Sequence, residues 1–280
     1  MDPYRGKDGD AMKAWKKNLP LKLAVAIAFI AMVILNYLAQ GLPLNGRTPS
    51  EVSDSMPNLF APAGFTFSIW GLIYLALGCF TVYQFGLRDS RIRLEARVKV
   101  RGLFILSSLG NIAWLLCWHY DYIGLSVVCM IILLISLALI NLILDEERPD
   151  RPDQAFYRLP FSLYFGWITV ATVANITAFL VRIGWNRFGL SEELWMIIIS
   201  LLAAVIGFAA TVKRKDLAYG LVLVFAYIGI LAKRLSAAGP APGSGVIMAV
   251  IVSLVILTIG VIYTAVAMVQ GRGRLAAVKQ

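Results

Sequence analysis

The chain has 280 residues, of which 59% are apolar and only 15% are charged, and its formal net charge is +10. Soluble domains contain about 45–50% apolar and roughly 25% charged residues, so this composition excludes an ordinary soluble globular domain. The positive charge does not indicate a nucleic-acid partner, because cationic loops that face anionic lipid headgroups produce the same excess. We therefore expect the lipid bilayer, and no nucleic acid, as the partner of these charges.

Eight apolar runs follow one another along the chain, each close to the ~20 residues that cross a hydrocarbon core as a helix. Only helices and closed barrels satisfy every backbone hydrogen bond inside a bilayer, and long runs without alternation form helices. The sequence therefore predicts an all-α, polytopic membrane helix bundle with spans at 21–40, 63–86, 102–119, 122–144, 160–182, 194–212, 217–233 and 245–270.

The distribution of basic residues predicts how this bundle is oriented. If the N-terminus is cytoplasmic, 21 of the 26 Lys and Arg residues fall on the cytoplasmic side. The opposite side keeps five: Arg47, Arg182, Arg187, Lys233 and Arg234. A bias of this size in short loops sets the orientation of helical membrane proteins. We expect a multi-pass protein of the plasma (inner) membrane with both termini in the cytoplasm.

The segment 41–62 is the longest connection on the expected outer side. Its prolines and the pair Asn45-Gly46 predict an ordered, turn-rich loop rather than a helix. Thr48 or Ser50, followed by Glu51, fits the capping of a short helical turn within that loop.

No Asp, Glu, Lys or Arg lies in the middle of a predicted span, which argues against a carboxylate-driven pump or antiporter and leaves passive carriage open. The cysteines Cys79, Cys117 and Cys129 lie in apolar spans without the spacing of a disulfide framework or a metal site. The chain has no phosphate-binding glycine loop and no nucleophile elbow. We therefore expect no metal, no required cofactor, no catalytic residues and no enzyme activity.

Three predicted spans combine aromatic residues with amide or small residues at helical spacing. This pattern predicts a cavity lined by aromatic rings with a few polar groups, which suits a flat, apolar ligand. The alternatives are that the amides only join helices by hydrogen bonds, and that the tryptophans belong to an interfacial belt. The candidate residues are Trp70 and Tyr74 in the second span, Asn111 and Trp114 in the third, and Trp167, Ala171 and Asn175 in the fifth.

Other aromatic residues lie at the ends of spans, where an interfacial belt is expected. They are Trp118, Tyr120, Tyr122, Trp185 and Trp195. His119, the only histidine, is expected to be a surface residue of this belt. A haem ligand or an acid/base group would need a partner, and Asp121 is the one nearby candidate.

Three segments of the chain resemble one known family. The stretch from Ala61 to Gly78 is similar to the Pro-Pro-Gly-Trp-x-Phe-x-x-x-Trp-x-x-x-Tyr signature of the tryptophan-rich sensory protein/translocator protein (TspO/MBR, peripheral benzodiazepine receptor) family. Asn111-x-x-Trp114 resembles the Asn-x-x-Trp of its third helix, and the stretch from Pro160 to Asn175 is similar to its fifth helix. The chain departs from the signature at Ala63 and Phe65, and from the sterol motif by lacking a Tyr before Arg182.

The resemblance implies a five-helix core with a ligand cavity beneath the first outer loop, binding porphyrins and related apolar molecules. It places Trp70, Tyr74, Asn111, Trp114, Trp167, Ala171 and Asn175 in the cavity lining, with Pro62, Gly64 and Phe65 as the hinge of a lid. It also implies a homodimer. The chain then divides into a basic tail at 1–20, a five-helix core at 21–185, and three further helices with a short tail at 186–280.

These observations give a leading hypothesis and two alternatives. The leading hypothesis is a non-enzymatic membrane receptor or carrier that binds a flat hydrophobic ligand such as a porphyrin. The first alternative is a small-solute permease or channel completed by the last three spans. The second alternative is a light-dependent, porphyrin-degrading activity driven by the tryptophans.

Overall fold

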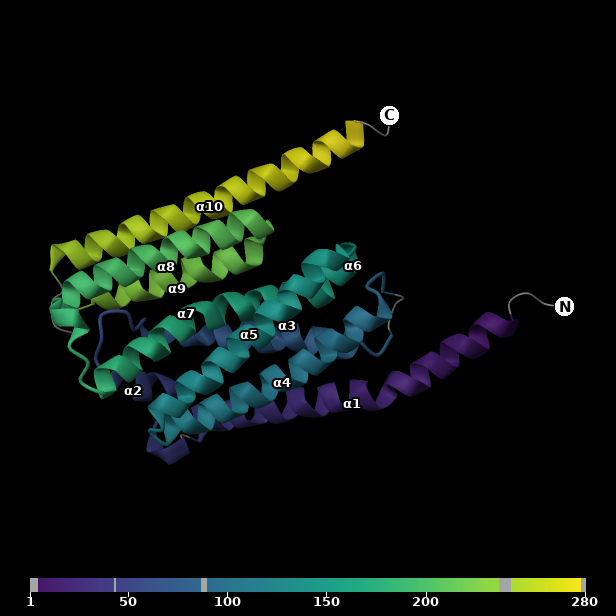
Figure 1. Ribbon diagram of the computed structural model, residues 1–280, viewed down its shortest axis with the longest axis horizontal. Helices are drawn as coiled ribbons and strands as arrows, with labels where there is room; N and C mark the ends of the chain where they lie inside the picture. The colour runs from purple at the N-terminus through teal and green to yellow at the C-terminus, as the bar shows by residue number, and fades with distance from the viewer. Residues whose placement is uncertain (1–4, 43, 87–89, 237–242, 278–280) are drawn as a thin grey trace.

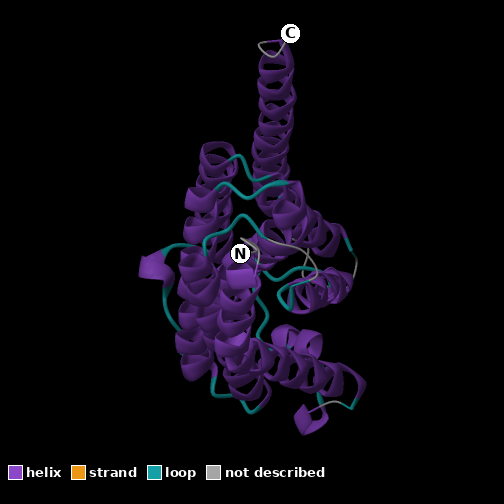
Figure 2. Ribbon diagram, turned by 90° about the vertical axis from the view of Figure 1, so that its right-hand side faces the viewer, coloured by secondary structure: helices purple, strands orange, loops and turns teal. Residues whose placement is uncertain are grey.

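The computed structural model describes residues 5–42, 44–86, 90–236 and 243–277, and this part of the chain forms helices joined by loops, with no strand (Figures 1 and 2). Eight of its helices are long and apolar enough to cross a membrane, which confirms the predicted polytopic all-α bundle. The shortest of them has 19 residues. At 1.5 Å per residue it rises roughly 28 Å, close to the thickness of a hydrocarbon core.

The long helices follow the predicted spans, with short helical turns between them. They are α1 (Arg5–Gly41), α3 (Ile69–Tyr83), α4 (Leu94–His119), α5 (Ile123–Glu147), α7 (Leu159–Arg182), α8 (Glu192–Arg214), α9 (Leu217–Leu235) and α10 (Ser244–Ala277). The short elements are η1 (Leu44–Gly46), α2 (Pro49–Asp54), η2 (Gly64–Ser68), α6 (Arg151–Asp153), η3 (Gln154–Arg158) and η4 (Arg187–Gly189). The second predicted span thus begins as a 3₁₀ turn, η2, that runs into α3.

The helices form two groups that lie side by side (Figure 1). The first group, α1, α3, α4, α5 and α7, is called the core below, and the second group, α8, α9 and α10, is called the extension. Within the core α4 packs against α1 and α5, and α7 packs against α5 and α3. Within the extension α10 packs against α8 and α9, while α9 also packs against α7 of the core. The extension therefore joins the core mainly through α9.

A glycine on α7 allows this close approach. A Cβ atom built on Gly166 would lie 3.0 Å from Cβ of Val222 and 3.1 Å from the carbonyl oxygen of Tyr219, both on α9. Small residues at such contacts let two helix backbones approach in a membrane, where packing rather than the hydrophobic effect drives association.

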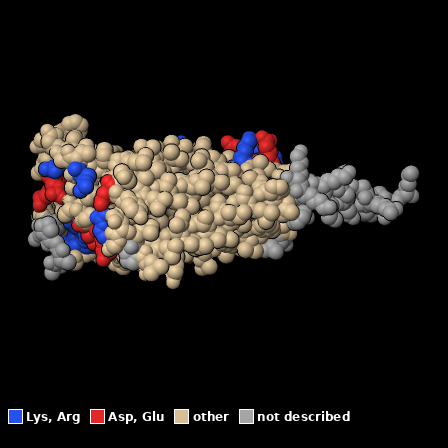
Figure 3. Space-filling view, turned by 90° about the horizontal axis from the view of Figure 1, so that it is seen from below, with Lys and Arg blue, Asp and Glu red and all other residues tan. Residues whose placement is uncertain are grey.

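Charged residues lie at the two ends of the bundle, and on the face shown in Figure 3 the wide band between them carries none. The start of α1 and the end of α10 lie at one end of the bundle, called here the terminal end (Figure 1). The opposite end carries α2 and the 41–62 loop and is called the loop end. This segregation of charge is the pattern expected of a protein that spans a bilayer.

The 41–62 loop is ordered by local hydrogen bonds, and α2 is its one α-helical turn. The Thr48 hydroxyl accepts a hydrogen bond from the Glu51 backbone N–H at 3.3 Å, while the Glu51 carboxylate accepts one from the Thr48 N–H at 2.7 Å. This reciprocal arrangement is a capping box. Of the two caps considered from the sequence, Thr48 is the one that forms.

The loop is attached to the core at the turn between α4 and α5. Arg47 forms an ion pair with Asp121 at 2.6 Å, and the Asn45 amide donates to the His119 carbonyl oxygen at 2.9 Å. Because His119 is the last residue of α4 and Asp121 follows it by two residues, the loop is held over the end of that helix.

The loop and the turn that follows it are also attached to α9 of the extension. The Ala63 backbone N–H donates to the Gly229 carbonyl oxygen at 3.0 Å, and Lys233 forms an ion pair with Asp54. Thr66 packs directly on Gly229, where a Cβ atom would lie 2.0 Å from the Thr66 hydroxyl oxygen. Only glycine at position 229 therefore allows this contact.

Candidate functional site

The rings of Trp70, Tyr74, Trp114, Tyr164 and Trp167 form one aromatic cluster in the half of the core that faces the loop end. Trp70 lies at its centre: its ring stacks on Tyr74 at 5.4 Å between centroids, with an interplanar angle of 18°. Trp114, Tyr164 and Trp167 lie 6.2, 5.8 and 6.1 Å from Trp70. Each favourable aromatic pair adds about 0.5–1.5 kcal/mol beyond its buried area. The structure thus brings the three predicted spans together around Trp70.

The Asn175 amide fixes one wall of this cluster. Its Oδ1 accepts a hydrogen bond from Trp114 Nε1 at 3.1 Å, and its Nδ2 donates to the Ser126 hydroxyl at 2.9 Å. All three side chains are buried. Asn175 therefore orients the Trp114 ring and joins α7 to α4 and α5, which is the helix-joining role considered as an alternative for the amides.

Asn111 is held on both sides of its amide. Its Oδ1 accepts a hydrogen bond from Asn36 Nδ2 at 2.7 Å, and the buried hydroxyls of Tyr74 and Tyr164 interact with the same side chain. By contrast, Trp167 Nε1 is shielded from solvent and has no acceptor among the described residues. Buried polar atoms in native proteins usually have a partner, so this donor beside the aromatic cluster indicates a site that a polar ligand group would complete.

Two hollows meet at Trp70. The first, the inner cavity, measures about 40 Å³ and is lined by Pro62, Trp70, Trp114, Trp167, Ala171 and Asn175 together with Phe67 and Trp118. The second, the side groove, measures about 420 Å³ and lies between α1 and α3, lined by Val33, Asn36, Tyr37, Gln40, Gly64, Phe65, Trp70 and Tyr74. Phe67, Trp70 and Trp114 contribute to both and form the partition between them.

The two hollows differ in the size of ligand that they hold. Sites for drug-sized ligands measure about 300–1,000 Å³, a range that includes the side groove but not the inner cavity. Tyr37 and Gly71, at the edge of the side groove, are exposed on membrane-spanning helices. The groove therefore opens sideways, toward the hydrocarbon of the bilayer.

The three residues implied as a lid hinge lie on opposite sides of the partition. Pro62 faces the inner cavity, while Gly64 and Phe65 face the side groove. The Phe65 ring is half exposed and packs edge-on against Phe225 of α9 at 6.2 Å. The hinge segment therefore lies between the two hollows.

Two residues assigned to an interfacial belt are instead buried, and the expectation is wrong for both. Trp118 is 5% exposed: it stacks on Trp114 at 6.0 Å, and its Nε1 donates to the Pro49 carbonyl oxygen at 3.2 Å. His119 has no exposed surface, and its Nδ1 lies 2.8 Å from the Leu115 carbonyl oxygen. The 41–62 loop covers both side chains, and the apolar pattern of α4 alone did not reveal this cover.

Sequence reasoning also missed other parts of the site. Asn36 on α1 holds Asn111, Tyr164 on α7 packs on Trp70, and Phe67 packs on Trp167 at 6.0 Å. Two of these had a usable signal, because Tyr164 precedes Trp167 by three residues and Phe67 precedes Trp70 by three, so that each pair shares one helical face.

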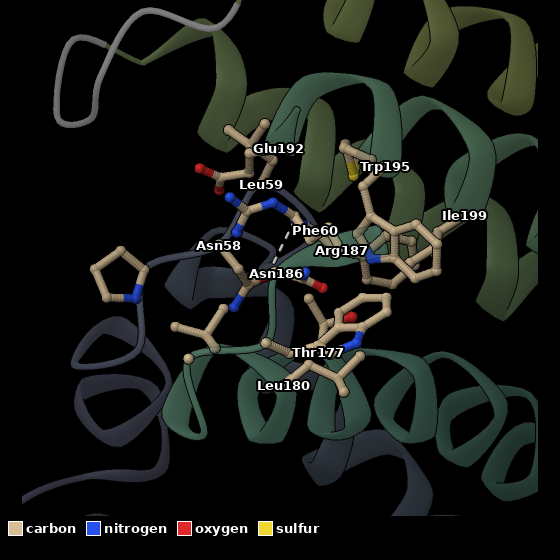
Figure 4. Close-up of a pocket in the computed structure, with 15 residues that line it drawn as sticks. Asn58, Leu59, Phe60, Thr177, Leu180, Asn186, Arg187, Glu192, Trp195 and Ile199 are labelled. Atoms are coloured by element: carbon tan, nitrogen blue, oxygen red, sulfur yellow. Dashed lines mark hydrogen bonds between the residues drawn. The ribbon is translucent and has the colours of Figure 1, made fainter. Parts of the chain in front are cut away.

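A further hollow lies at the loop end, on the boundary between the core and the extension. Figure 4 shows residues of the 57–60 segment, α7 and α8 converging on this tryptophan pocket of about 320 Å³. Trp185 and Trp195 pack edge-to-face there at 4.8 Å, beside Arg187 and Glu192. The same 57–62 segment thus separates the inner cavity from the tryptophan pocket, and Asn58 lines both.

Comparison with known proteins assigns this architecture. No curated protein and no solved structure matched the chain. The model of the family described as TSPO-like protein matches residues 22–263, so the match begins within α1, includes the rest of the core with α8 and α9, and ends within α10. With eight membrane-spanning helices and a match across most of its length, the chain is an integral membrane protein that belongs to the TSPO-like family.

Proposed function

We propose that this protein is a membrane receptor or carrier that binds a flat hydrophobic ligand, such as a porphyrin, against the aromatic cluster. The observation that carries the proposal is the aromatic cluster around Trp70, beside which the buried donor Trp167 Nε1 has no acceptor among the described residues. Leaving a buried donor without an acceptor costs about 1–3 kcal/mol, and a bound ligand with acceptor groups would remove that cost. The rings around this donor supply stacking surfaces.

The proposed ligand enters from the bilayer through the side groove. The groove of about 420 Å³ already has the size of a ligand site, whereas the inner cavity of about 40 Å³ does not. A planar ligand would first lie against Trp70 and Tyr74 and then displace the Trp70 ring. Because this ring is part of the partition, its displacement would join the side groove to the inner cavity. Pro62, Gly64 and Phe65 would fix the partition from the loop side. Ala171, which lines the inner cavity, leaves room there because its side chain is small.

The protein would lie in the plasma (inner) membrane with both termini in the cytoplasm, as the positive-inside bias indicates. The terminal end of the bundle would then face the cytoplasm. It would require no cofactor, perform no catalysis and act as a homodimer. Its partners would be the bilayer and one small hydrophobic ligand.

The proposal is tested by titrating protoporphyrin IX in the dark into the protein in lipid nanodiscs and following the porphyrin absorbance. We expect saturable binding of one porphyrin per chain, weakened about tenfold by Trp70→Ala, since each aromatic stacking contact of 0.5–1.5 kcal/mol is a factor of two to ten. The matched control is Trp195→Ala, which removes the same side chain from the tryptophan pocket and leaves the affinity unchanged. Equal affinities of the wild type and Trp70→Ala contradict the proposed site.

A permease is the second candidate, favoured by the position of two other hollows. The tryptophan pocket at the loop end and a cavity of about 860 Å³ at the terminal end both lie along the boundary between the core and the extension. Close packing of Gly166 against α9 closes this boundary between them. A permease would carry solute across liposomes that contain the protein, at a rate that Gly166→Ala lowers. Liposomes that remain tight to small solutes would exclude this candidate.

A further inference from the structure

A cavity at the terminal end is separate from the aromatic site and lies between α5 and α7 of the core and all three helices of the extension. Its volume of about 860 Å³ is twice that of the side groove. Because this cavity is lined by both groups of helices, whatever occupies it touches the core and the extension at once.

The cavity is strongly positive. Five cationic side chains and two carboxylates line it, a net charge of +3: Arg148, Arg158, Lys213, Arg214 and Lys215 against Asp145 and Asp216. A concave surface lined by one sign of charge concentrates ligands of the opposite sign. The expected ligand group is therefore an anion.

The two deeper arginines are already balanced by the two carboxylates. Arg158 forms an ion pair with Asp145, and its second nitrogen lies 3.7 Å from Asp216. Arg214 Nε lies 3.1 Å from Asp145, and the Ser162 hydroxyl donates to Asp216 at 2.6 Å. Arg214 Nη2 lies 3.9 Å from Asp216, so both deeper arginines are paired with the two carboxylates.

The three outer cations are not balanced. Arg148, Lys213 and Lys215 are exposed, and none of them forms an ion pair with another described residue. Arg148 and Lys215 end α5 and α8 in the left-handed conformation, with φ of 47° and 52°. This conformation costs a non-glycine residue about 1–2 kcal/mol. The C-terminal ends of two helices thus bring three unpaired cations from the core and the extension to one rim.

The opposite wall of the cavity is apolar. Leu142, Leu159, Ala209 and Met268 line it on membrane-spanning helices, and the first two are exposed large hydrophobic residues. Leu142 and Ala209 precede the charged ends of α5 and α8 by at least one helical turn, so they lie deeper in the bilayer than the three cations. The cavity therefore has a cationic end at the level of lipid headgroups and an apolar end beside lipid chains.

We propose that this cavity binds one anionic phospholipid of the adjacent leaflet. The phosphate would contact Arg148, Lys213 and Lys215, and the beginning of an acyl chain would lie along Leu142, Ala209 and Met268. Basic cavities between membrane helices bind anionic headgroups in this way. The lipid would connect the core to the extension at the end of the bundle opposite the α9–loop contact. A free phosphate compound shares the headgroup chemistry but lacks the chain that the apolar wall would hold.

The test measures binding of phosphatidylglycerol to the delipidated full chain in mixed micelles by native mass spectrometry. Phosphatidylcholine and sn-glycerol 3-phosphate are measured in parallel. We expect one tightly bound phosphatidylglycerol per chain, with phosphatidylcholine weaker and sn-glycerol 3-phosphate unable to displace the lipid. Lys213→Gln/Lys215→Asn should weaken phosphatidylglycerol binding about 25-fold, because each of the two cations near a membrane surface contributes about a factor of five. Asn suits position 215 since it tolerates the left-handed conformation.

A charge-matched control and a second variant keep the test decisive. Arg91→Gln/Lys99→Gln removes two exposed cations near the same end of the bundle but outside the cavity, and should leave phosphatidylglycerol affinity unchanged. Ala209→Phe retains every charge but fills the apolar wall, and should weaken phosphatidylglycerol too. The proposal would be overturned if the two double variants lost the same affinity for phosphatidylglycerol, or if both phospholipids bound equally well. It would also be overturned if sn-glycerol 3-phosphate displaced the bound lipid.

Discussion

The 41–62 loop is attached to two regions of the molecule by different kinds of contact. Toward the core, polar groups meet helix ends: Arg47 pairs with Asp121, and Trp118 donates to the Pro49 carbonyl oxygen. Toward the extension, the attachment is mainly steric, because the Thr66 side chain packs directly on Gly229 of α9. The partly exposed Arg47–Asp121 pair can break and reform with little cost, whereas close packing tolerates almost no displacement. The comparison indicates that the extension limits movement of the loop and leaves the side groove as the easier entry to the aromatic cluster.

The largest expected effect comes from breaking the steric attachment. In Gly229→Ala the new Cβ would lie 2.0 Å from the Thr66 hydroxyl oxygen and 3.0 Å from its Cβ. Overpacking of this kind costs about 1–3 kcal/mol, more than the gain of about 0.5–1 kcal/mol from removing a helical glycine. We expect a lower midpoint of thermal unfolding in detergent.

Two further variants sharpen this measurement. Gly102→Ala adds the same methyl group to α4, where a Cβ would meet nothing within 4 Å, and should leave the midpoint unchanged or slightly higher. Thr66→Ala combined with Gly229→Ala removes the clashing atoms and should recover part of the loss. If Gly229→Ala were as stable as Gly102→Ala, the steric attachment would not be the stronger one.

The next largest effect on stability is expected at the attachment of the loop to the core. It is measured with two Trp→Phe variants that remove the same side-chain volume. Trp118→Phe removes the donor to the Pro49 carbonyl oxygen and should cost about 1–3 kcal/mol of stability. Trp167→Phe removes a buried Nε1 with no acceptor among the described residues, so only the ring volume is lost. Thermal unfolding should therefore report a larger loss for Trp118→Phe, while protoporphyrin IX binding should weaken more in Trp167→Phe. A reversed order would mean that the Trp167 nitrogen has a structural role.

The core side of this comparison was largely predictable from the sequence. The apolar runs determine the eight spans, and helical spacing places Trp70 with Tyr74, and Asn111 with Trp114, on shared faces. Those side chains do meet at one aromatic cluster. The capping box of Thr48 and Glu51 was also predictable, because it depends only on two residues that are three positions apart.

The extension side was not predictable, for a physical reason. Nothing in the hydropathy of α9 distinguishes Gly229 from a lipid-facing glycine, because the reason for the glycine is Thr66, far away in the sequence. The burial of Trp118 and His119 likewise depends on a loop that folds back over α4. Contacts between distant segments leave no periodic signal in either segment, so burial at span ends needs the tertiary structure.

A smaller effect comes from the two ion pairs that hold the loop, Arg47–Asp121 and Lys233–Asp54. All four side chains are partly exposed, so each pair should contribute about 0.2–1 kcal/mol and less at high salt. The pairs share no residue, and we expect the stability losses of Arg47→Gln and Lys233→Gln to add in the double variant. A loss in the double variant that differs from the sum by more than about 0.5 kcal/mol would show that the two attachments act as one.

The smallest expected effect is a local response of α2 to acid. Hydrogen bonds from the Thr48 backbone N–H and hydroxyl lower the pKa of the Glu51 carboxyl from its usual 4.5, because they favour the ionised form. A lowered pKa in the folded protein means that Glu51 stabilises the capped loop above pH 4.5, and that this contribution is lost as the pH falls through the lower folded value. Amide hydrogen exchange of residues 48–55 should therefore be slower in the wild type than in Glu51→Gln near neutral pH, and the two rates should converge as the pH falls through the folded value. Equal protection at neutral pH would mean that the capping box does not hold the loop, leaving its order to the attachments on either side.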